Sequence, residues 1–479
     1  MDLPNRFQVE PFSYDLDLAL NAGISANLLF WSVSIWSETW NFDIYSTGGG
    51  GGGSPANHIS KAIAELKPQE FTLMSRGYLN AKDGGRAMDN KVLGRDGVEV
   101  FPSSKRMRAL DPSAGELFVQ ADGFPYSEPA LDVRGSSRML LWVKDAGTNR
   151  IAQNANALNW NVWDGSAWVD QGLLWDDGTG DSRPQLSLLA NGNALAAWQN
   201  SGYALFSTSG LDQALSSLEI AVARYNGTNW TAFNLTTNSV MDRAPQLSVA
   251  ANGTALLTWQ RNNGALDPES LVMSQVDSLY YAFWNGANWS SPQLLALNAG
   301  LVLGASVAWN GGVGYLFVAI DADQDITTDT DQEIYSATYS GGGWSPLTRR
   351  TSNNIQDTRP QVVYDINDNP LVTWYQDGKI YSSTAVTLAN PALVGNIQKT
   401  SAAQDYRLMT GSRGEISVVW SDSIEAPFFQ NPFLFNYDRS FGCWSKPVPL
   451  LTDSALERSY SGKFATNGAL VLAYNKVEV

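Results

Sequence analysis

The stretch that decides the fold is Asp181-Ser-Arg-Pro-Gln-Leu-Ser-Leu-Leu-Ala-Asn-Gly-Asn-Ala-Leu-Ala-Ala-Trp198. Its pattern returns from Asp242 to Trp259 and, with more changes, from Asp357 to Trp374. Each copy consists of two apolar runs of strand length around an Asn/Asp/Gly turn, which is the strongest local indication of a β-hairpin. A repeat of roughly 45–60 residues with several strands per period is typical of a radial array or a solenoid.

A second motif follows most of these hairpins. It reads Ala223-Arg-Tyr-Asn-Gly-Thr-Asn-Trp230 and, one period later, Ala282-Phe-Trp-Asn-Gly-Ala-Asn-Trp289. Related copies lie at 161–168, 337–344 and 435–444. Two hairpins per period form a four-stranded antiparallel sheet, which is one blade of a β-propeller. The sequence therefore predicts an all-β protein, a β-propeller of four-stranded antiparallel blades.

The number of blades depends on how the first part of the chain is counted. We predict eight blades if 68–124 is an insertion, against nine if it is a degenerate blade and seven if the first ~70 residues pack outside the ring. The whole chain, 1–479, is expected to form a single propeller. The last hairpin lacks its outer pair, and we expect an N-terminal strand, with Arg6–Val9 as the candidate, to complete that blade and remove an exposed edge. The glycine-rich segment 48–54 is either a natural turn or an engineered linker.

Composition limits the function classes. The 479 residues carry a net charge of −16, with a sequence pI near 4.5. Nucleic-acid phosphates and anionic membrane surfaces would be repelled, whereas metal ions and cationic partners are favoured. One cysteine, Cys443, and one histidine, His58, exclude an intramolecular disulfide, a thiolate zinc site and a multi-histidine metal site. No apolar run approaches the ~18–20 residues that span a bilayer.

The loops are expected to divide between two faces. Turns within hairpins are short, whereas the connections between the two hairpins of a blade are long, at roughly 200–218, 261–277, 321–333 and 421–430. In a four-stranded meander alternate connections lie on opposite faces, so the long connections share one face, which we call the long-loop face. Variable loops on a rigid scaffold commonly carry function, so we expect binding there.

The strongest chemical signal on the long-loop face is an acidic segment. It reads Asp321-Ala-Asp-Gln-Asp-Ile-Thr-Thr-Asp-Thr-Asp-Gln-Glu333. An EF-hand is rejected, because Ile326 replaces its central glycine and Gln332 its final glutamate. Two interpretations remain, a Ca²⁺ site and a solvated acidic loop that aids solubility. The candidate metal ligands are Asp321, Asp323, Asp325, Asp329, Asp331 and Glu333.

Tryptophan is abundant, with 18 residues, and most of them occupy repeat positions. We predict that these pack between neighbouring blades. Aromatic residues outside the repeat are freer to bind a ligand by stacking. The candidate ligand-binding residues are Trp36, Trp40, Phe428 and Phe429.

A second polar signal is an Asp at the entry of the innermost strand. It occurs at 181, 242, 357 and 405, with an Arg two residues later in three copies. Because the pattern keeps the symmetry of the repeat, we interpret it as structural, the alternative being a polar ring at the channel mouth. No catalytic residues are proposed, since a Ser-His-Asp triad would need His58 and the chain has no Gly-x-Ser-x-Gly elbow.

The alternation of Asp-x-Arg-Pro-Gln-Leu-Ser and Asn-Gly-x-Ala-Leu-x-x-Trp with the motif 331–346 resembles the propeller modules of large exported and cell-surface proteins of bacteria and archaea. The resemblance covers nearly the whole chain and implies export and association with other extracellular modules. The Ser-x-Asp-x-Gly-x-x-Trp turn of sialidase-like propellers is missing, so membership of that family is not supported. The segment 1–6 lacks the pattern of a signal peptide, which leaves a cytoplasmic protein or the mature piece of an exported one. We expect an extracellular or cell-surface location.

Three functions follow as hypotheses. The main one is a non-enzymatic module that binds a protein or a glycan at the cell surface through the long-loop face, with Ca²⁺ as its only expected cofactor. The alternative is a glycoside hydrolase with paired carboxylates at the channel mouth, drawn from acids such as Asp267, Glu269, Glu425 and Glu457. The third is a structural subunit of a surface assembly.

Overall fold

The computed structural model describes most of the chain after residue 128 and shorter pieces before it. The described residues are 69–76, 78–79, 92–93, 99–100, 109–110, 116–123, 129–145, 154, 156–165, 167–205, 211–262, 277–321, 323, 330–396, 406–423, 430–439, 441–450 and 455–478. The predicted closing strand at 6–9, the glycine-rich segment 48–54 and His58 lie outside them.

Antiparallel pairing groups the strands of the middle of the chain into four blades, which we number by their place in the ring. Blade 2 contains β11 (Asp181–Leu188), β12 (Ala194–Ser201), β13 (Leu218–Tyr225) and β14 (Trp230–Asn234). Blade 3 contains β15 (Met241–Val249), β16 (Ala255–Asn262), β17 (Asp277–Trp284) and the first part of β18 (Gln293–Trp309). Blade 4 contains the second part of β18 with β19 (Gly314–Asp321), β20 (Gln332–Ser340), β21 (Gly343–Trp344) and β22 (Thr348–Arg349). Blade 5 contains β23 (Asp357–Tyr364), β24 (Pro370–Gln376), β25 (Lys379–Ser383) and β26 (Ala392–Asn396).

Three further blades belong to one fifteen-stranded sheet. Blade 1 contains β7 (Ala130–Arg134), β8 (Ser137–Asp145), β9 (Asn156–Trp163) and β10 (Trp168–Leu173). Blade 6 contains β27 (Tyr406–Thr410), β28 (Ile416–Ser423), β29 (Gln430–Asp438), β30 (Cys443–Ser445) and β31 (Val448–Pro449). Blade 7 contains β32 (Ala455–Phe464), β33 (Leu470–Glu478), β1 (Gln69–Arg76) and β6 (Glu116–Gly123).

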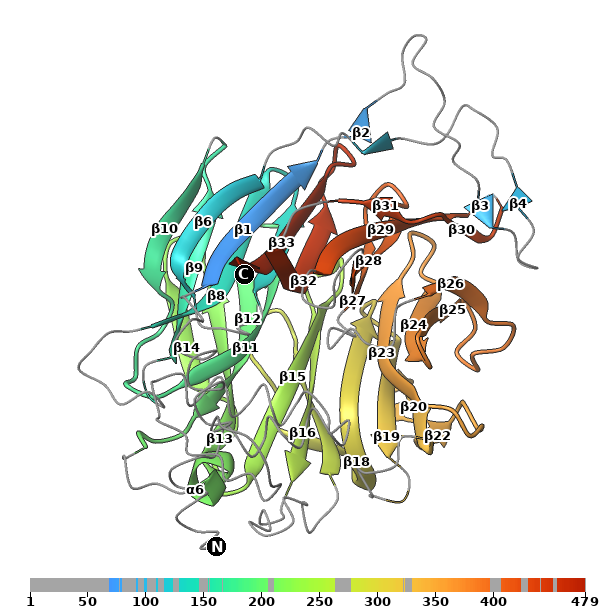
Figure 1. Ribbon diagram of the computed structural model, residues 1–479. Helices are drawn as coiled ribbons and strands as arrows, with labels where there is room; N and C mark the ends of the chain where they lie inside the picture. Colours follow the sequence, from blue (N-terminus) through green and yellow to red (C-terminus); the bar gives the residue numbers. More distant parts are fainter. Residues whose placement is uncertain are drawn as a thin grey trace, which may run out of the picture.

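The innermost strands of these blades form a closed ring (Figure 1). Contacts run from β7 to β11, β15, β18, β23, β27 and β32, and β32 contacts β7 again. Seven blades therefore complete the ring in the described part of the chain. The all-β propeller is confirmed, and the described residues form seven blades where eight were predicted.

An N-terminal strand closes the last blade, as expected, but it is a different one. β1 pairs with β33 from Glu70 opposite Lys476 to Arg76 opposite Leu470, so β1 occupies the place that was predicted for 6–9. Both β1 and β6 come from the segment 68–124, which was predicted to be an insertion or a degenerate blade. Between them lie the short strands β2 (Tyr78–Leu79), β3 (Val92–Leu93), β4 (Glu99–Val100) and β5 (Ala109–Leu110).

Side chains link neighbouring blades. At six of the seven junctions a backbone N–H donates to a side-chain oxygen of the preceding blade. These bonds are Leu188 to Asp132, Ala244 to Gln199, Trp309 to Ser248, Val362 to Ser306, Leu408 to Gln361 and Leu131 to Ser461. The last bond joins blade 7 to blade 1, so a specific hydrogen bond stabilises the closure of the ring.

The repeated Asp-x-Arg-Pro-Gln motif forms a β-bulge. The pairing of β11 with β12 shifts between Ser182 and Gln185, and Arg183 in the gap has a φ of 51°. The equivalent residue Arg359 also has a φ of 51°. A bulge with a left-handed residue bends the strand and re-aims its side chains. The repeat therefore encodes a bend at the entry of the inner strand.

The repeat tryptophans fill the space between blades. Trp198, Trp259, Trp374 and Trp420 are almost completely buried. Trp198 belongs to the same core cluster as Leu141 of blade 1 and Trp259 to the same cluster as Ala197 of blade 2. The prediction that these residues pack between blades is confirmed.

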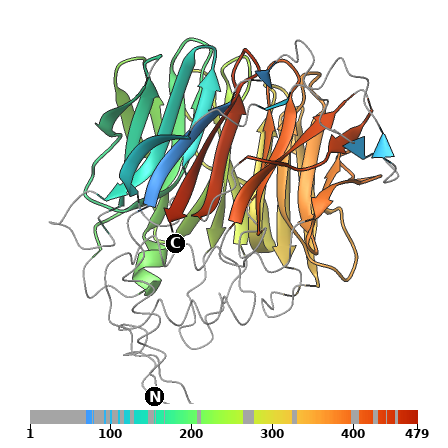
Figure 2. The ribbon, with the colours of Figure 1, turned by 45° about the horizontal axis from the view of Figure 1, so that its top comes forward.

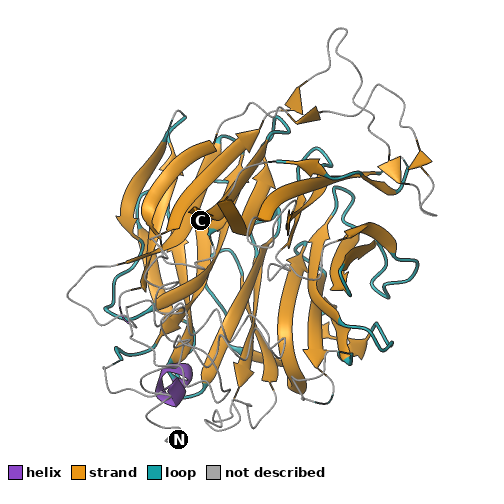
Figure 3. Cartoon of the chain, viewed as in Figure 1, coloured by secondary structure: helices purple, strands orange, loops and turns teal. Residues whose placement is uncertain are grey.

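The long connections gather at one end of the strands. In Figure 2 the strands run between the two faces of the ring and helix α6 (Leu211–Ser216) lies beyond their lower ends. Because α6 lies in the connection from β12 to β13, this end is the long-loop face. Apart from this helix, the structured part of the described chain is almost entirely strand (Figure 3). None of the described helices is long and apolar enough to cross a membrane.

Candidate functional site

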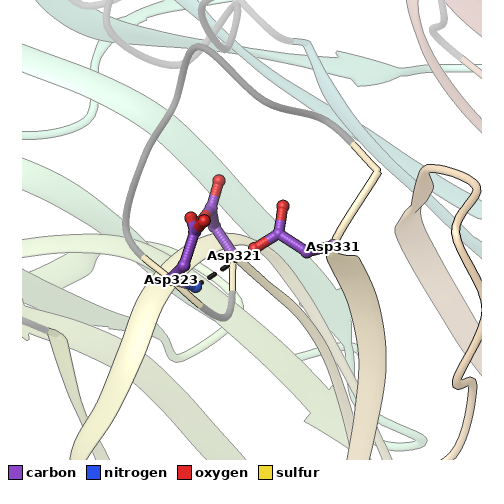
Figure 4. Close-up of side chains that lie close together, drawn as sticks. All are labelled: Asp321, Asp323 and Asp331. Atoms are coloured by element: carbon purple, nitrogen blue, oxygen red, sulfur yellow. Dashed lines mark hydrogen bonds between the residues drawn. The ribbon is translucent and has the colours of Figure 1, made fainter.

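Blade 4 brings three of the predicted acidic residues together on the long-loop face. Asp321 ends β19, Asp331 immediately precedes β20, and Asp323 lies in the connection between these strands (Figure 4). One carboxylate oxygen from each lies within 4.8 Å of the others. The backbone N–H of Asp323 donates to Oδ2 of Asp331 at 3.1 Å, which holds the two sides of the loop together.

The three carboxylates differ in exposure. Asp321 is fully buried at 0% exposure, Asp331 is half-buried and Asp323 is exposed. The group therefore reaches from the interior of the blade to solvent. An oxygen-only donor set of this kind fits a hard cation such as Ca²⁺, which takes 6–8 oxygen ligands. It does not suit a softer metal that prefers nitrogen or sulfur.

The other predicted ligands divide into two sets. Asp325 and Asp329 lie outside the described residues. Glu333 is not a member of the group, because it accepts hydrogen bonds from Arg349 at 2.5 Å and from the backbone of Asn353 at 2.8 Å. The strand alternation that suggested Glu333 as a ligand instead places it in a buried ion pair of the blade.

The predicted ligand-binding aromatic residues Trp36, Trp40, Phe428 and Phe429 also lie outside the described residues, and their role stays a prediction. Among the described residues of the long connections, Tyr203 is half-exposed and donates its hydroxyl to the carbonyl of Gln213. The same connection is held to blade 1 by Asn154, which both donates to and accepts from the backbone of Leu205. Neighbouring long connections are thus packed against each other.

At the junction of blades 2 and 3, Asn238 bridges the carboxylates of Glu219 and Asp242. Asn238 donates its side-chain amide to Oε2 of Glu219 at 3.3 Å and to Oδ2 of Asp242 at 2.7 Å. Its backbone N–H also donates to Oε1 of Glu219. Arg261 completes the group with two bonds to Asp242, at 2.7 and 2.8 Å.

The junction of blades 4 and 5 repeats this arrangement. Asn353 donates its backbone N–H to Glu333 and its side-chain amide to Asp357, at 2.8 and 2.7 Å. The arginine, however, has a different partner. Arg349 pairs with the glutamate, Glu333, whereas Asp357 accepts a hydrogen bond from the neutral side chain of Gln376. In each junction, therefore, one arginine is hydrogen-bonded to one of the two carboxylates.

In both junctions the carboxylate that is not bonded to the arginine has a raised pKa. Burial raises the pKa of Glu219 to about 7 and that of Asp357 to about 6. A carboxyl group with a raised pKa beside an ionised carboxylate can act as an acid–base pair. Here both members are buried and the pattern is repeated, so we interpret the two groups as structural links between blades. The signal in the sequence was the recurring Thr-x-Asn-x-x-x-Asp of 236–242 and 351–357.

The repeated Asp at the inner strand is structural. The indole Nε1 of the repeat tryptophan donates to this Asp in three blades. The pairs are Trp198 with Asp181, Trp259 with Asp242 and Trp374 with Asp357, at 2.6, 2.9 and 3.1 Å. The structural interpretation is thus confirmed for these three copies, and Asp405 lies outside the described residues. Cys443 is buried, and burial raises the pKa of its thiol to about 11, which makes it unreactive.

A seven-bladed ring with its long loops and an acidic group on one face defines a β-propeller with a candidate binding face. No protein-family model matches the chain, and no curated protein matches it. Solved structures similar to it include an α-L-arabinanase of Penicillium chrysogenum in complex with arabinobiose, 13% identical, covering 68% of this chain and 93% of that chain, with a TM-score of 0.42. A protein of unknown function from Dyadobacter fermentans is 12% identical, covers 74% and 94%, and has a TM-score of 0.42. A leech intramolecular trans-sialidase is 8% identical, covers 87% and 92%, and has a TM-score of 0.41. At these identities the likeness concerns the fold and says nothing of activity.

Proposed function

We propose that this propeller binds a carbohydrate on its long-loop face and that a calcium ion held by Asp321, Asp323 and Asp331 supports the binding. The observation that carries the proposal is the convergence of these three carboxylates, with oxygens within 4.8 Å of one another, on the face that holds the long loops. Asp325 and Asp329 of the same loop are proposed as further ligands.

The proposed roles follow from the exposure of each group. Asp321 and Asp331 would bind the ion from the two strand ends, and Asp323 would add a ligand at the exposed edge of the site, where other coordination positions stay open to solvent. A calcium ion with coordination positions left open to solvent can bind vicinal hydroxyl groups of a sugar. A glycan fits such a site better than nucleic acid does, because the chain carries a net charge of −16. Trp36, Trp40, Phe428 and Phe429 are proposed as stacking partners for sugar rings.

The cation part of the proposal is tested by isothermal titration of calcium into the chelator-treated chain. We expect saturable binding that weakens about tenfold or more in Asp323→Asn and Asp331→Asn, since each variant removes one charged oxygen ligand. Asp368→Asn is the matched control. It removes the same charge from an exposed turn on the opposite face, where a φ of 58° suits asparagine. Equal binding in all three variants, or no binding by the original chain, contradicts the proposal.

Glycoside hydrolysis is the second candidate. It needs two carboxyl groups about 5–9.5 Å apart that a substrate can reach. Asp267, Glu269 and Glu425 lie outside the described residues, and Glu457 lies in β32. The named arabinanase and trans-sialidase make arabinan and sialylated oligosaccharides the first substrates to try. Release of a free sugar in proportion to the amount of purified chain would replace the binding proposal with an enzymatic one.

The setting of this function is also proposed. The expected extracellular or cell-surface location and assembly with other extracellular modules follow from the resemblance of the repeats. A structural role in a larger assembly would show itself as self-association of the purified chain without any carbohydrate ligand.

A further inference from the structure

The junctions of blades 2 and 3 and of blades 4 and 5 have the same hydrogen bonds but different charge partners. In each, a short link runs from the outermost strand of one blade to the inner strand of the next, and an asparagine in that link bonds a glutamate and an aspartate. The link of the first junction is 235–240 and that of the second is 350–356. Comparing the two junctions therefore shows how the charge partners differ within one shared arrangement of hydrogen bonds.

The glutamate of the first junction has no arginine of its own. By strand register Asn234, opposite Ala221, occupies the position of Arg349, opposite Tyr335. Arg349 pairs with Glu333, whereas Asn234 accepts a hydrogen bond from Asn200. The arginine of the first junction is instead bonded to the neighbouring aspartate.

Glu219 lies opposite Asn200 of β12 and is enclosed by groups from the link and from the long connection after β12. The link supplies Asn238 and the hydroxyl of Thr236, and the long connection after β12 brings Gly202 against its side chain. The charged groups that act on it are Asp242 at the start of β15, which disfavours its ionisation, and Arg261 of β16, which favours it. Both carboxylates accept from the side-chain nitrogen of Asn238, at 3.3 and 2.7 Å. The two accepting oxygens therefore lie close to each other.

We propose that Glu219 is a proton-dependent latch between blades 2 and 3, which holds the link 235–240 when protonated and loosens it when ionised. Ionisation places a second negative charge beside Asp242 in a buried site, where only one arginine is available. The link and the adjoining long connection then separate more readily. At the junction of blades 4 and 5 the equivalent glutamate, Glu333, has Arg349 as its own charge partner.

The sign of the pH dependence follows from burial, which raises the pKa of Glu219 from 4.5 to about 7. The folded chain binds this proton more tightly than the unfolded chain does. The stabilising contribution is therefore complete below pH 4.5, declines as the pH rises and is lost above about 7.

The test is hydrogen exchange of the link 235–240 from pH 6 to pH 8.5. The ratio of its exchange rate to the intrinsic rate of the same sequence at each pH removes the general effect of pH on exchange. We expect this ratio to rise about tenfold or more in the original chain, since one unit of pKa shift corresponds to a factor of ten. In Glu219→Gln the ratio should stay nearly constant with pH.

A second variant keeps the proposal testable if Glu219→Gln does not fold. Asn234→Arg gives the first junction the arginine that the second has, and we expect it to reduce the rise of the ratio. A rise of the same size in Glu219→Gln, or in Asn234→Arg, as in the original chain would overturn the latch.

Discussion

Replacing Asp132 with alanine is expected to destabilise the chain by about 3 kcal/mol, because this carboxylate joins three consecutive blades. Oδ1 of Asp132 accepts from Nζ of Lys463 in blade 7 at 2.6 Å, and Oδ2 accepts from the backbone of Leu188 in blade 2 at 2.6 Å. Oδ1 also accepts from the backbone of Val133. Alanine leaves two buried N–H groups without this acceptor. Urea denaturation followed by tryptophan fluorescence measures the loss.

Lys463→Met separates the ion pair from the backbone bonds. The side chain of Lys463 is 41% exposed, whereas that of Asp132 is 4% exposed. A pair that reaches solvent in this way contributes at most about 1 kcal/mol. We expect Lys463→Met to cost less than Asp132→Ala, because the carboxylate of Asp132 keeps its two backbone hydrogen bonds. Equal losses in the two variants, or none in either, would show that the ring is not held at this point as described.

Replacing Asp242 with alanine is expected to cost about 3–5 kcal/mol, because it leaves a mostly buried guanidinium without its partner. Asp242 accepts from Trp259, from Arg261 and from Asn238, and the side chain of Arg261 is only 16% exposed. Its removal therefore breaks the tryptophan anchor and the interblade link together. The free energy of unfolding in urea is again the measurement.

The matched control is Asp357→Ala at the equivalent position of blade 5. Asp357 also accepts from a tryptophan and an asparagine, but its third partner is the neutral Gln376. Loss of neutral hydrogen bonds costs about 1–3 kcal/mol. We expect Asp242→Ala to be the more damaging of the two. The reverse order would contradict the assignment of the charge partners.

The repeats predicted the fold class because each copy carries its own hairpin turn and its own interblade tryptophan. They failed on the blade count because the last blade is assembled from both ends of the chain. β1 and β6 carry neither the Asp-x-Arg-Pro-Gln motif nor the repeat tryptophan, and residues 77–115 separate them in sequence. Blade 4 shows a similar limit. Its inner strand has Val302 where blades 2, 3 and 5 have aspartate, so the motif is lost while the strand pairing is kept.

The acidic group was predictable because strand ends place neighbouring loop residues side by side. Asp321 and Asp331 flank the connection between β19 and β20, and the pairing of Asp321 with Gln332 brings them together. Glu333 lies outside the group of three carboxylates and pairs with Arg349, which is sixteen residues away, because sequence alternation gives the face of a strand but not its partner. The group of Glu219, Asn238, Asp242 and Arg261 was not predicted from the sequence, because its members come from four separate segments.

The measurement that tests the central claim most directly is binding of the purified chain to a broad glycan array, with calcium and with a chelator. We predict selective binding to a related set of glycans that is lost with the chelator and in Asp331→Asn, and retained in Asp368→Asn. A blank array in calcium, or binding that is unchanged by both the chelator and Asp331→Asn, would contradict a calcium-supported carbohydrate site on the long-loop face.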